Sequence, residues 1–282
     1  MRLPGATAVL ALALVVPAGA WAQQPVAFDS LDRDAGGAPV VLTAVWFAAA
    51  RTPAPAAVLL HGCGGAFDRR GRLGERMREY TALLNAQGVS VLVPDSLGPR
   101  GESELCTQRT AARRVTQLNR RLDALAALAW LAQRRDVSPG KVGLIGWSHG
   151  GSAVLAATNL AHPAVAKAAV RPAFAVAFYP GCEAELRRGY RAAAPLLLLV
   201  GELDDWTPAE PCRQLAARVE GAAVQFEAYT GAYHGFDGTA PVRLRRDVPN
   251  GVHPGQGVHV GADVQARDRS RERLTEFLAQ QR

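Results

Sequence analysis

Short apolar runs alternate along this chain with longer segments in which apolar residues recur every three or four positions. The short runs have the length of buried strands, and the longer segments have the period of amphipathic helices. The strand-like runs cover residues 40–47, 57–60, 89–94, 142–145, 174–179, 195–200 and 223–229. The helix-like segments cover residues 74–87, 109–134, 149–160, 209–219 and 266–280. This alternation predicts an α/β fold, with a mostly parallel sheet covered by helices on both faces.

The first 22 residues have the pattern of a secretory signal peptide. Arg2 supplies a positive start, residues 8–16 are apolar, and residues 20–22 form an Ala-Trp-Ala cleavage site. The apolar stretch is too short to span a bilayer, so we expect no stable membrane insertion. We predict that residues 1–22 are removed, that the protein is periplasmic or secreted, and that residues 23–282 form a single domain.

A candidate nucleophile follows the apolar run 142–145. Residues 146–150 read Gly-Trp-Ser-His-Gly, a G-x-S-x-G sequence with Ser148 at its centre. This sequence is typical of a sharp strand-to-helix turn that exposes a serine hydroxyl, and its glycines leave room for a strained serine backbone. Because a glycine-rich chain can contain the motif by chance, the neighbouring motifs decide its meaning.

An acid and a histidine follow two later strands. The run 195–200 leads into a turn with Asp204, and the run 223–229 leads to His234. The carboxyl ends of parallel strands meet at one edge of a sheet, so we expect Ser148, Asp204 and His234 to lie together. Ser148 would then attack an acyl carbon, His234 would carry the proton, and the carboxylate would orient the imidazole.

Two neighbouring aspartates compete for the role of the acid. We favour Asp204, because it comes first in its turn and lies four residues before Pro208, where the next helix is expected to start. Asp205 is then expected to be exposed or to cap that helix.

A glycine-rich turn, His-Gly-Cys-Gly-Gly at residues 61–65, follows the run 57–60. The backbone N–H groups of Cys63 and of His149, the residue after the serine, are predicted to form an oxyanion hole. The alternative is an ordinary turn with no chemical role. We expect the imidazole of His149 to pack or to lie at the rim, and not to act as an acid or base.

The chain has four cysteines, which export would make available for disulfides. Three pairings are possible, and we favour Cys63–Cys106 with Cys182–Cys212 because each pair joins loops at the same end of the predicted sheet. The sequence has no C-x-x-C, and its six histidines lack the spacing of metal ligands. We therefore expect no metal.

The formal net charge of +7 is carried mainly by arginines. Aromatic residues do not alternate with these arginines, as stacking on single-stranded nucleic acid requires, so we expect no nucleic-acid partner. The sequence leaves the oligomeric state open.

Together these motifs resemble the dienelactone hydrolase family of α/β-hydrolases over residues 55–280. The matching stretches are residues 61–65, 95–101, 146–151, 201–208 and 233–236. The resemblance implies the α/β-hydrolase fold and cofactor-free hydrolysis of a small ester or lactone through a covalent acyl-enzyme, with Ser148, Asp204 and His234 as the catalytic residues. The best-known members carry a cysteine where this chain has Ser148, so we expect a general carboxylesterase.

The resemblance also bears on substrate binding. Arg100 stands where family members have an arginine that binds a substrate carboxylate, although it could instead only tie down its own loop. Trp147 and Trp206 are expected to line or support the pocket, with plain core packing as the alternative. The Gly- and Pro-rich segment 238–261 predicts a long loop that shapes this pocket.

Two other functions stay open at this point. A cutinase-like hydrolase of polyesters or lipids also carries Gly-Trp-Ser-x-Gly-Gly, and a catalytically inactive binding protein could retain the same fold. The His-Gly-Phe sequence at residues 234–236 favours the carboxylesterase over the cutinase-like enzyme. An intact set of catalytic residues argues against an inactive protein.

Overall fold

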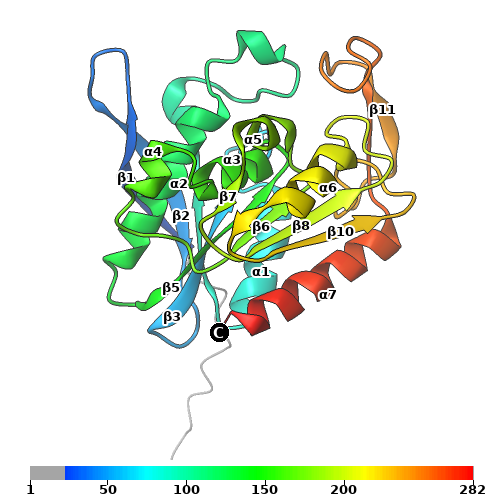
Figure 1. The fold of residues 1–282 in the computed structure, drawn as a ribbon. Coiled ribbons are helices and arrows are strands. Elements are labelled where there is room, and N and C mark those ends of the chain that lie inside the picture. The colour runs from blue at the N-terminus through cyan, green and yellow to red at the C-terminus, as the bar shows by residue number, and fades with distance from the viewer. Residues whose placement is uncertain (1–22, 282) are drawn as a thin grey trace, which may run out of the picture.

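The computed structural model describes residues 23–281, in which a twisted sheet lies between two layers of helices (Figure 1). The predicted signal peptide, residues 1–22, lies outside the described residues. Within residues 23–281 the main sheet has eight strands in the spatial order β1-β2-β4-β3-β5-β6-β8-β10. These strands are β1 (Gln23–Arg33), β2 (Pro39–Phe47), β3 (Ala54–Leu60), β4 (Ser90–Pro94), β5 (Val137–Trp147), β6 (Ala175–Phe178), β8 (Leu196–Gly201) and β10 (Val224–Tyr229).

The strands from β4 to β10 in this order pair in parallel, whereas β2 pairs antiparallel with both β4 and β1. The register places Leu60 of β3 beside Gly146 of β5, and Phe178 of β6 beside Trp147. The predicted fold class, a mostly parallel α/β sheet, is therefore confirmed.

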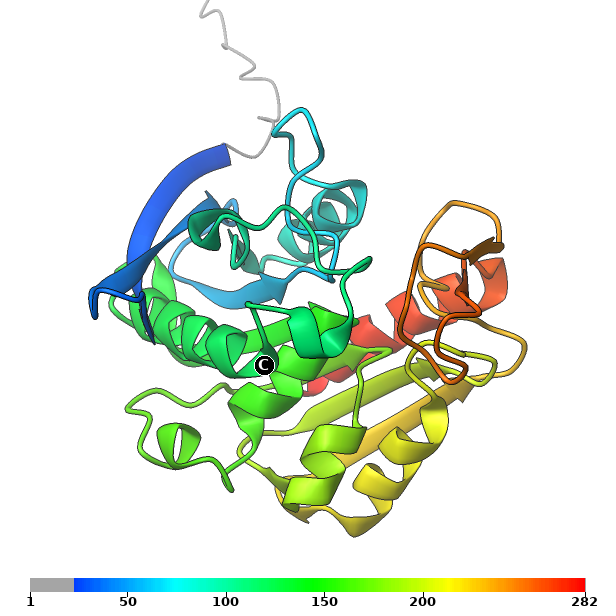
Figure 2. The same ribbon diagram turned by 90° about the horizontal axis from the view of Figure 1, so that it is seen from above.

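Helices cover both faces of the sheet (Figure 2). The longer helices are α1 (Glu75–Ala86), α2 (Gln117–Ala132), α3 (His149–Thr158), α6 (Ala209–Arg218) and α7 (Val264–Gln280). Helices α2, α3 and α6 share a core with Leu196 and Leu198, while α1 and α7 share a second core with Leu197 and Leu199. Successive residues of β8 thus supply both cores, which explains why this strand reads as a continuous apolar run.

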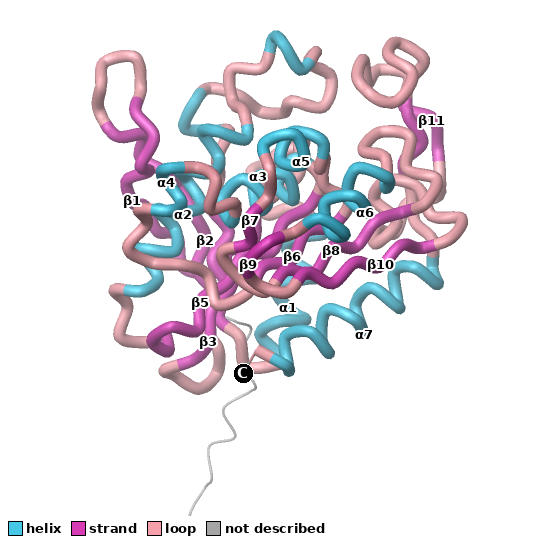
Figure 3. Tube along the Cα trace, viewed as in Figure 1, coloured by secondary structure: helices cyan, strands magenta, loops and turns pink. Residues whose placement is uncertain are grey.

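Several loops lie above the carboxyl ends of the parallel strands (Figure 3), whereas β7 (Arg191–Ala192) and β9 (Glu220–Gly221) directly precede β8 and β10 at their amino ends. The segment 238–261, predicted as one long loop, contains β11 (Arg243–Arg245) and β12 (Val258–Val260), which pair antiparallel. The other short elements are η1 (Gly98–Arg100), η2 (Thr110–Ala112), α4 (Pro163–Ala166) and α5 (Glu183–Arg188). In the part of the chain that the structure describes, no helix is both long and apolar enough to cross a bilayer.

One strand was missed by the sequence analysis, and one helix begins later than predicted. Strand β1 was not predicted, because its exposed and buried residues alternate as in an edge strand and give no continuous apolar run. The helix predicted over residues 109–134 begins only at Gln117, since Thr116 and Asn119 form a capping box that starts it there.

Candidate active site

Ser148 stands in a sharp turn between β5 and α3. Its backbone has φ 54° and ψ −118°, a conformation that residues other than glycine rarely adopt. A Cβ at Gly146 would lie 2.3 Å from the carbonyl oxygen of Gly150, and a Cβ at Gly150 would lie 2.0 Å from that of Leu60. Both positions require glycine, because β3, β5 and α3 approach too closely here for any side chain.

The side chains of Ser148, His234 and Asp204 form a hydrogen-bonded chain. Ser148 Oγ lies 2.9 Å from His234 Nε2, and His234 Nδ1 lies 2.8 Å from Asp204 Oδ2. All three residues are buried, and they follow β5, β10 and β8 respectively. In this arrangement the imidazole can accept the serine proton while the carboxylate fixes its tautomer.

The carboxylate of Asp204 is held by four hydrogen bonds. Its Oδ1 accepts the backbone N–H groups of Trp206 at 2.9 Å and Thr207 at 2.8 Å, and its Oδ2 accepts the Thr207 hydroxyl at 3.0 Å besides His234. Thr207 therefore belongs to the site, although it was not singled out from the sequence. Its place three residues after an aspartate in a turn is the signal that could have identified it.

Asp205 points elsewhere and binds His259. Its Oδ2 lies 2.7 Å from His259 Nδ1, and its Oδ1 accepts the His259 backbone N–H at 2.8 Å. The expectation that Asp205 is exposed or caps the next helix was wrong. Its bonds instead attach β12 to the turn that carries Asp204.

The turn before Cys63 lies against Ser148, since a Cβ at Gly62 would be 3.7 Å from Ser148 Cβ. The backbone N–H of Ser96 donates to His61 Nε2 at 3.3 Å, so His61 Nδ1 carries the proton that it donates to Gly62 O at 2.8 Å. The carbonyl of Gly62 and the N–H of Cys63 belong to one planar trans peptide and point in opposite directions. The hydrogen bond from His61 to the Gly62 carbonyl therefore also fixes the direction of the Cys63 N–H. Within the described residues that N–H has no backbone acceptor, which leaves it available to a substrate oxygen.

Two buried histidines flank this turn in the neutral form. Burial and the nearby charge of Arg120 hold the pKa values of His61 and His149 well below the ordinary value of a histidine. His149 Nδ1 accepts a hydrogen bond from Arg120 Nη1 at 3.0 Å. This bond anchors the imidazole to α2; that it takes no part in proton transfer stays a prediction.

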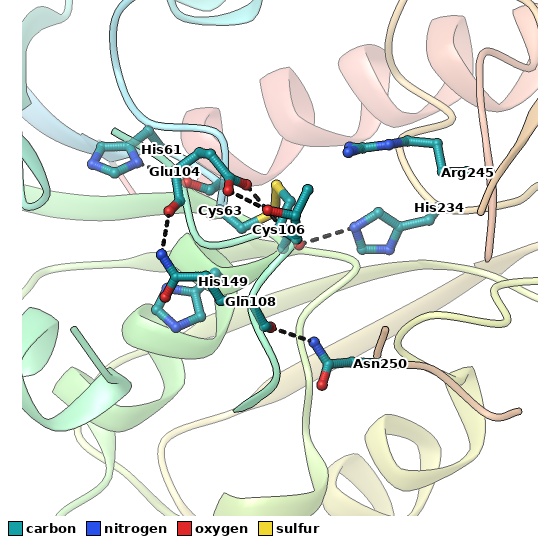
Figure 4. Close-up of a disulfide and its surroundings, with 12 residues drawn as sticks. His61, Cys63, Glu104, Cys106, Gln108, His149, His234, Arg245 and Asn250 are labelled. Atoms are coloured by element: carbon teal, nitrogen blue, oxygen red, sulfur yellow. Dashed lines mark hydrogen bonds between the residues drawn. A yellow bond between two sulfur atoms is a disulfide. The ribbon is translucent and has the colours of Figure 1, made fainter. Parts of the chain in front are cut away.

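The four cysteines form the pairs Cys63–Cys106 and Cys182–Cys212, which are the pairs favoured from the sequence. Figure 4 shows the first disulfide with the histidines of the site around it. This bond joins the turn that carries the Cys63 N–H to the loop before α2, where the Leu105 N–H also donates to Cys63 O at 2.8 Å. Two disulfides are consistent with an exported protein.

A pocket of about 280 Å³ opens beside Ser148. Charged side chains line its rim, among them Glu183 and Arg187, which pair with each other. The guanidinium of Arg113 also lines it and forms no hydrogen bond or ion pair within residues 23–281, and its Nε is buried without a partner. A larger hollow of about 350 Å³ lies between α1 and the loop after His234; Ser148 does not line it, but His61 and Gly62 of the neighbouring turn do.

The two predicted pocket tryptophans lie in different places. Trp206 lines the pocket, and its ring centroid is 4.6 Å from that of His234. Trp147 is 1% exposed, stacks on Phe178 with ring centroids 5.4 Å apart, and belongs to the core beneath α1 and α7. The substrate-binding prediction for Trp147 is thereby corrected: its side chain points from β5 into this core and does not line the pocket.

Arg100 is fully engaged by the protein itself. Its five N–H donors go to Asp32, Asp123 and the carbonyl oxygen of Ser96, at distances from 2.7 to 3.2 Å. No donor is left for a substrate carboxylate, and Arg100 does not line the pocket. This geometry corrects the substrate-binding prediction and supports the alternative, in which Arg100 ties down its loop.

Asp237 is a further buried acid that was not singled out from the sequence. It accepts two hydrogen bonds from Arg76, one from Trp147 Nε1 at 3.0 Å and one from the Tyr179 hydroxyl at 2.7 Å. The charge of Arg76 and these donors outweigh burial and lower the pKa of Asp237. Its place three residues after His234 lets it anchor the loop that carries the imidazole.

Within residues 23–281 no three His, Cys, Asp or Glu side chains are grouped so that they could hold a metal ion.

Comparisons with known proteins agree with this architecture. The model of the dienelactone hydrolase family matches residues 42–282, and a search of curated proteins finds no match. Thermogutta terrifontis esterase 2 phosphorylated by paraoxon has 17% identity and a TM-score of 0.62, covering 90% of this chain and 94% of that one. The dienelactone hydrolase-like promiscuous phosphotriesterase P91 from metagenomic libraries has 17% identity and a TM-score of 0.60, and the match covers 92% of this chain and 98% of that one. The dienelactone hydrolase from Anabaena variabilis has 19% identity and a TM-score of 0.54, and the match covers 75% of this chain and 88% of that one. At these identities the likeness is one of fold.

Proposed function

The chain belongs to the dienelactone hydrolase family and is a hydrolase that acts on esters, and we propose that it is an exported serine carboxylesterase for small esters or lactones. The observation that supports this proposal most strongly is the buried chain of hydrogen bonds from Ser148 through His234 to Asp204. An inactive binding protein would have no need of this geometry or of the strained serine backbone.

In the proposed reaction Ser148 is the nucleophile. As its Oγ attacks the acyl carbon, His234 Nε2 takes the hydroxyl proton, and Asp204 stabilises the imidazolium. His234 then gives that proton to the leaving alcohol oxygen, and the acyl group stays on Ser148. A water molecule then transfers a proton to His234 and attacks the acyl carbon, and His234 returns that proton to Ser148 Oγ as the bond to the acyl group breaks and the acid leaves.

The proposed oxyanion hole consists of the backbone N–H groups of Cys63 and His149. The free Cys63 N–H beside Ser148 supports the first donor. The second lies at the N-terminus of α3, where the helix dipole favours negative charge. One such donor stabilises the transition state by about 3 kcal/mol.

The size of the pocket favours a small ester over the cutinase-like alternative. Its volume of about 280 Å³ is small for a long acyl chain, and charged side chains line it. We expect hydrolysis of p-nitrophenyl esters to be fastest from acetyl to butyryl and to fall towards palmitoyl. Ser148→Ala is expected to lower kcat by about four orders of magnitude or more.

The same series of esters can refute the proposal. An optimum at long chains would favour a lipid or polyester hydrolase. No hydrolysis of any ester by folded, disulfide-bonded protein would favour the inactive binding protein.

We further propose that Arg113, not Arg100, binds an acidic group of the substrate. An unpaired guanidinium beside the nucleophile suits a carboxylate. Arg113→Gln is expected to raise KM about tenfold for p-nitrophenyl esters of dicarboxylic acids and to leave KM for p-nitrophenyl butyrate unchanged. Equal effects on both substrates would contradict this assignment.

Export is proposed from the signal-peptide pattern and supported by the two disulfides. Sequencing the N-terminus of protein recovered from the periplasm or medium should start at Gln23. Full-length protein confined to the cytoplasm would contradict export.

A further inference from the structure

Arg120 of α2 is completely buried beneath the proposed oxyanion hole. Its Nη2 donates to the carbonyl oxygen of His61 at 2.7 Å, and its Nη1 donates to His149 Nδ1 at 3.0 Å. Its Nε has no hydrogen-bond partner within the described residues. Both acceptors are neutral groups, so the positive charge of Arg120 is not cancelled by a contacting carboxylate.

The acid that acts most strongly on Arg120 is already engaged. Asp123 accepts two hydrogen bonds from Arg100, at 2.8 and 2.9 Å, and one from Ser30. Burial lowers the pKa of Arg120 to about 10, so the side chain still carries its charge at neutral pH. A buried guanidinium without a contacting counterion reduces stability, and proteins retain such features mainly at functional sites.

The two acceptors belong to the two halves of the proposed oxyanion hole. The His61 carbonyl lies in the turn that leads to Cys63, and the His149 side chain belongs to the first residue of α3. We propose that Arg120 is a positioning residue that holds both halves of the oxyanion hole and supplies the positive charge behind the developing oxyanion. This inference rests on the proposed function.

The charge of Arg120 acts on the reaction more than on substrate binding. Negative charge appears on the carbonyl oxygen only as Ser148 attacks, so the attraction to Arg120 grows towards the transition state. A neutral ester in the ground state gains little from it. Loss of Arg120 should therefore lower kcat and leave KM nearly unchanged.

The test compares Arg120→Met and Arg120→Lys with a matched control, Arg121→Met. Arg121 is the next residue of α2 and also donates to a histidine, His162 Nδ1 at 2.7 Å, which lies outside the proposed oxyanion hole. We expect Arg120→Met to lower kcat for p-nitrophenyl butyrate about 10- to 100-fold at nearly constant KM. Arg120→Lys should recover part of this loss, and Arg121→Met should match the wild type.

A trifluoromethyl ketone separates a role in the oxyanion hole from a general structural role. The adduct of this ketone with Ser148 carries the oxyanion. The inhibition constant of the ketone should therefore rise in Arg120→Met by the same factor by which kcat/KM for the ester falls. The matching methyl ketone, which forms little adduct, should bind with unchanged affinity. Equal losses for both ketones, or wild-type kcat in Arg120→Met, would overturn the inference.

If Arg120→Met does not fold, Arg120→Lys decides the question. A kcat lowered about fivefold or more at constant KM would support the inference, and a wild-type kcat would overturn it. If the wild-type protein showed no ester hydrolysis that Ser148→Ala abolishes, the proposed function itself would be overturned. This result differs from a wild-type kcat in the Arg120 variants, so the failure of the inference and the failure of the proposed function are distinguishable.

Discussion

At the scale of single residues, the strained backbone of Ser148 depends on the absence of two side chains. In Gly150→Ala the new Cβ would meet the Leu60 carbonyl oxygen at 2.0 Å. We expect this substitution to lower the free energy of unfolding by about 3 kcal/mol or more, as measured by urea denaturation. Gly64→Ala is the control, because its Cβ would meet nothing within 4 Å. Equal stabilities of the two variants would contradict the packing described for the turn.

The buried histidines predict a loss of stability at mildly acidic pH. His61 and His149 have folded-state pKa values well below 6.5, and the pKa of His162 is also lowered by burial. Between pH 6.5 and these lower values the unfolded chain binds protons that the folded chain does not. The free energy of unfolding should therefore fall below about pH 6.5, by up to about 1.4 kcal/mol per pH unit for each histidine.

Urea denaturation at pH 8, 7, 6 and 5.5 measures this dependence. These histidines contribute little slope between pH 7 and 8, where most imidazoles at these positions are neutral in both the folded and the unfolded state. A stability that stays constant down to pH 5.5 would contradict their neutral, buried state.

At the scale of elements, the two disulfides are expected to affect stability alike and activity differently. Replacing both cysteines of either pair by alanine should lower the free energy of unfolding by about 2–4 kcal/mol. Only the loss of Cys63–Cys106 should also lower kcat, because this bond holds the turn that presents the Cys63 N–H. Similar kcat values in the Cys63→Ala/Cys106→Ala and Cys182→Ala/Cys212→Ala variants would argue against that role.

Asp237 connects three elements behind the active site. It joins α1 through Arg76, β5 through Trp147 and the residue after β6 through Tyr179. Asp237→Ala should lower the free energy of unfolding by about 3–5 kcal/mol, since it leaves these buried donors without an acceptor. Asp247→Ala, which removes a mostly exposed ion pair with Arg245, should change it by less than about 1 kcal/mol. A thermal shift no larger in Asp237→Ala than in Asp247→Ala would refute this view of Asp237.

At the scale of the whole molecule, the parallel sheet was predictable because its strands are buried on both faces. A strand such as β8 must then be a continuous apolar run, and residues that follow such runs meet at one edge. Ser148 and Asp204 could be singled out for that reason, and His234 could be singled out because it follows the alternating sequence of β10. The edge strand β1 has one exposed face and lacks this signal.

The contacts around the site could not be predicted from local sequence. Arg100 and Arg113 look alike in the sequence, since both are arginines in or near loops. Only the fold shows that Arg100 forms ion pairs with Asp32 and Asp123, whereas Arg113 has no such partner within the described residues. Trp147 was misplaced because it adjoins Ser148 along the chain, yet its side chain enters the core on one face of the sheet. Arg120 gave no local signal, since its partners lie 29 and 59 residues away.

The central claim is that His234 and Asp204 activate Ser148 as the nucleophile. Mass spectrometry after reaction with a fluorophosphonate, which labels activated serines, tests it most directly. We predict one adduct per chain on the peptide that contains Ser148, labelling slowed by a factor of about a thousand or more in His234→Ala, and no adduct in Ser148→Ala. An adduct on another residue, or undiminished labelling of Ser148→Ala, would contradict the account.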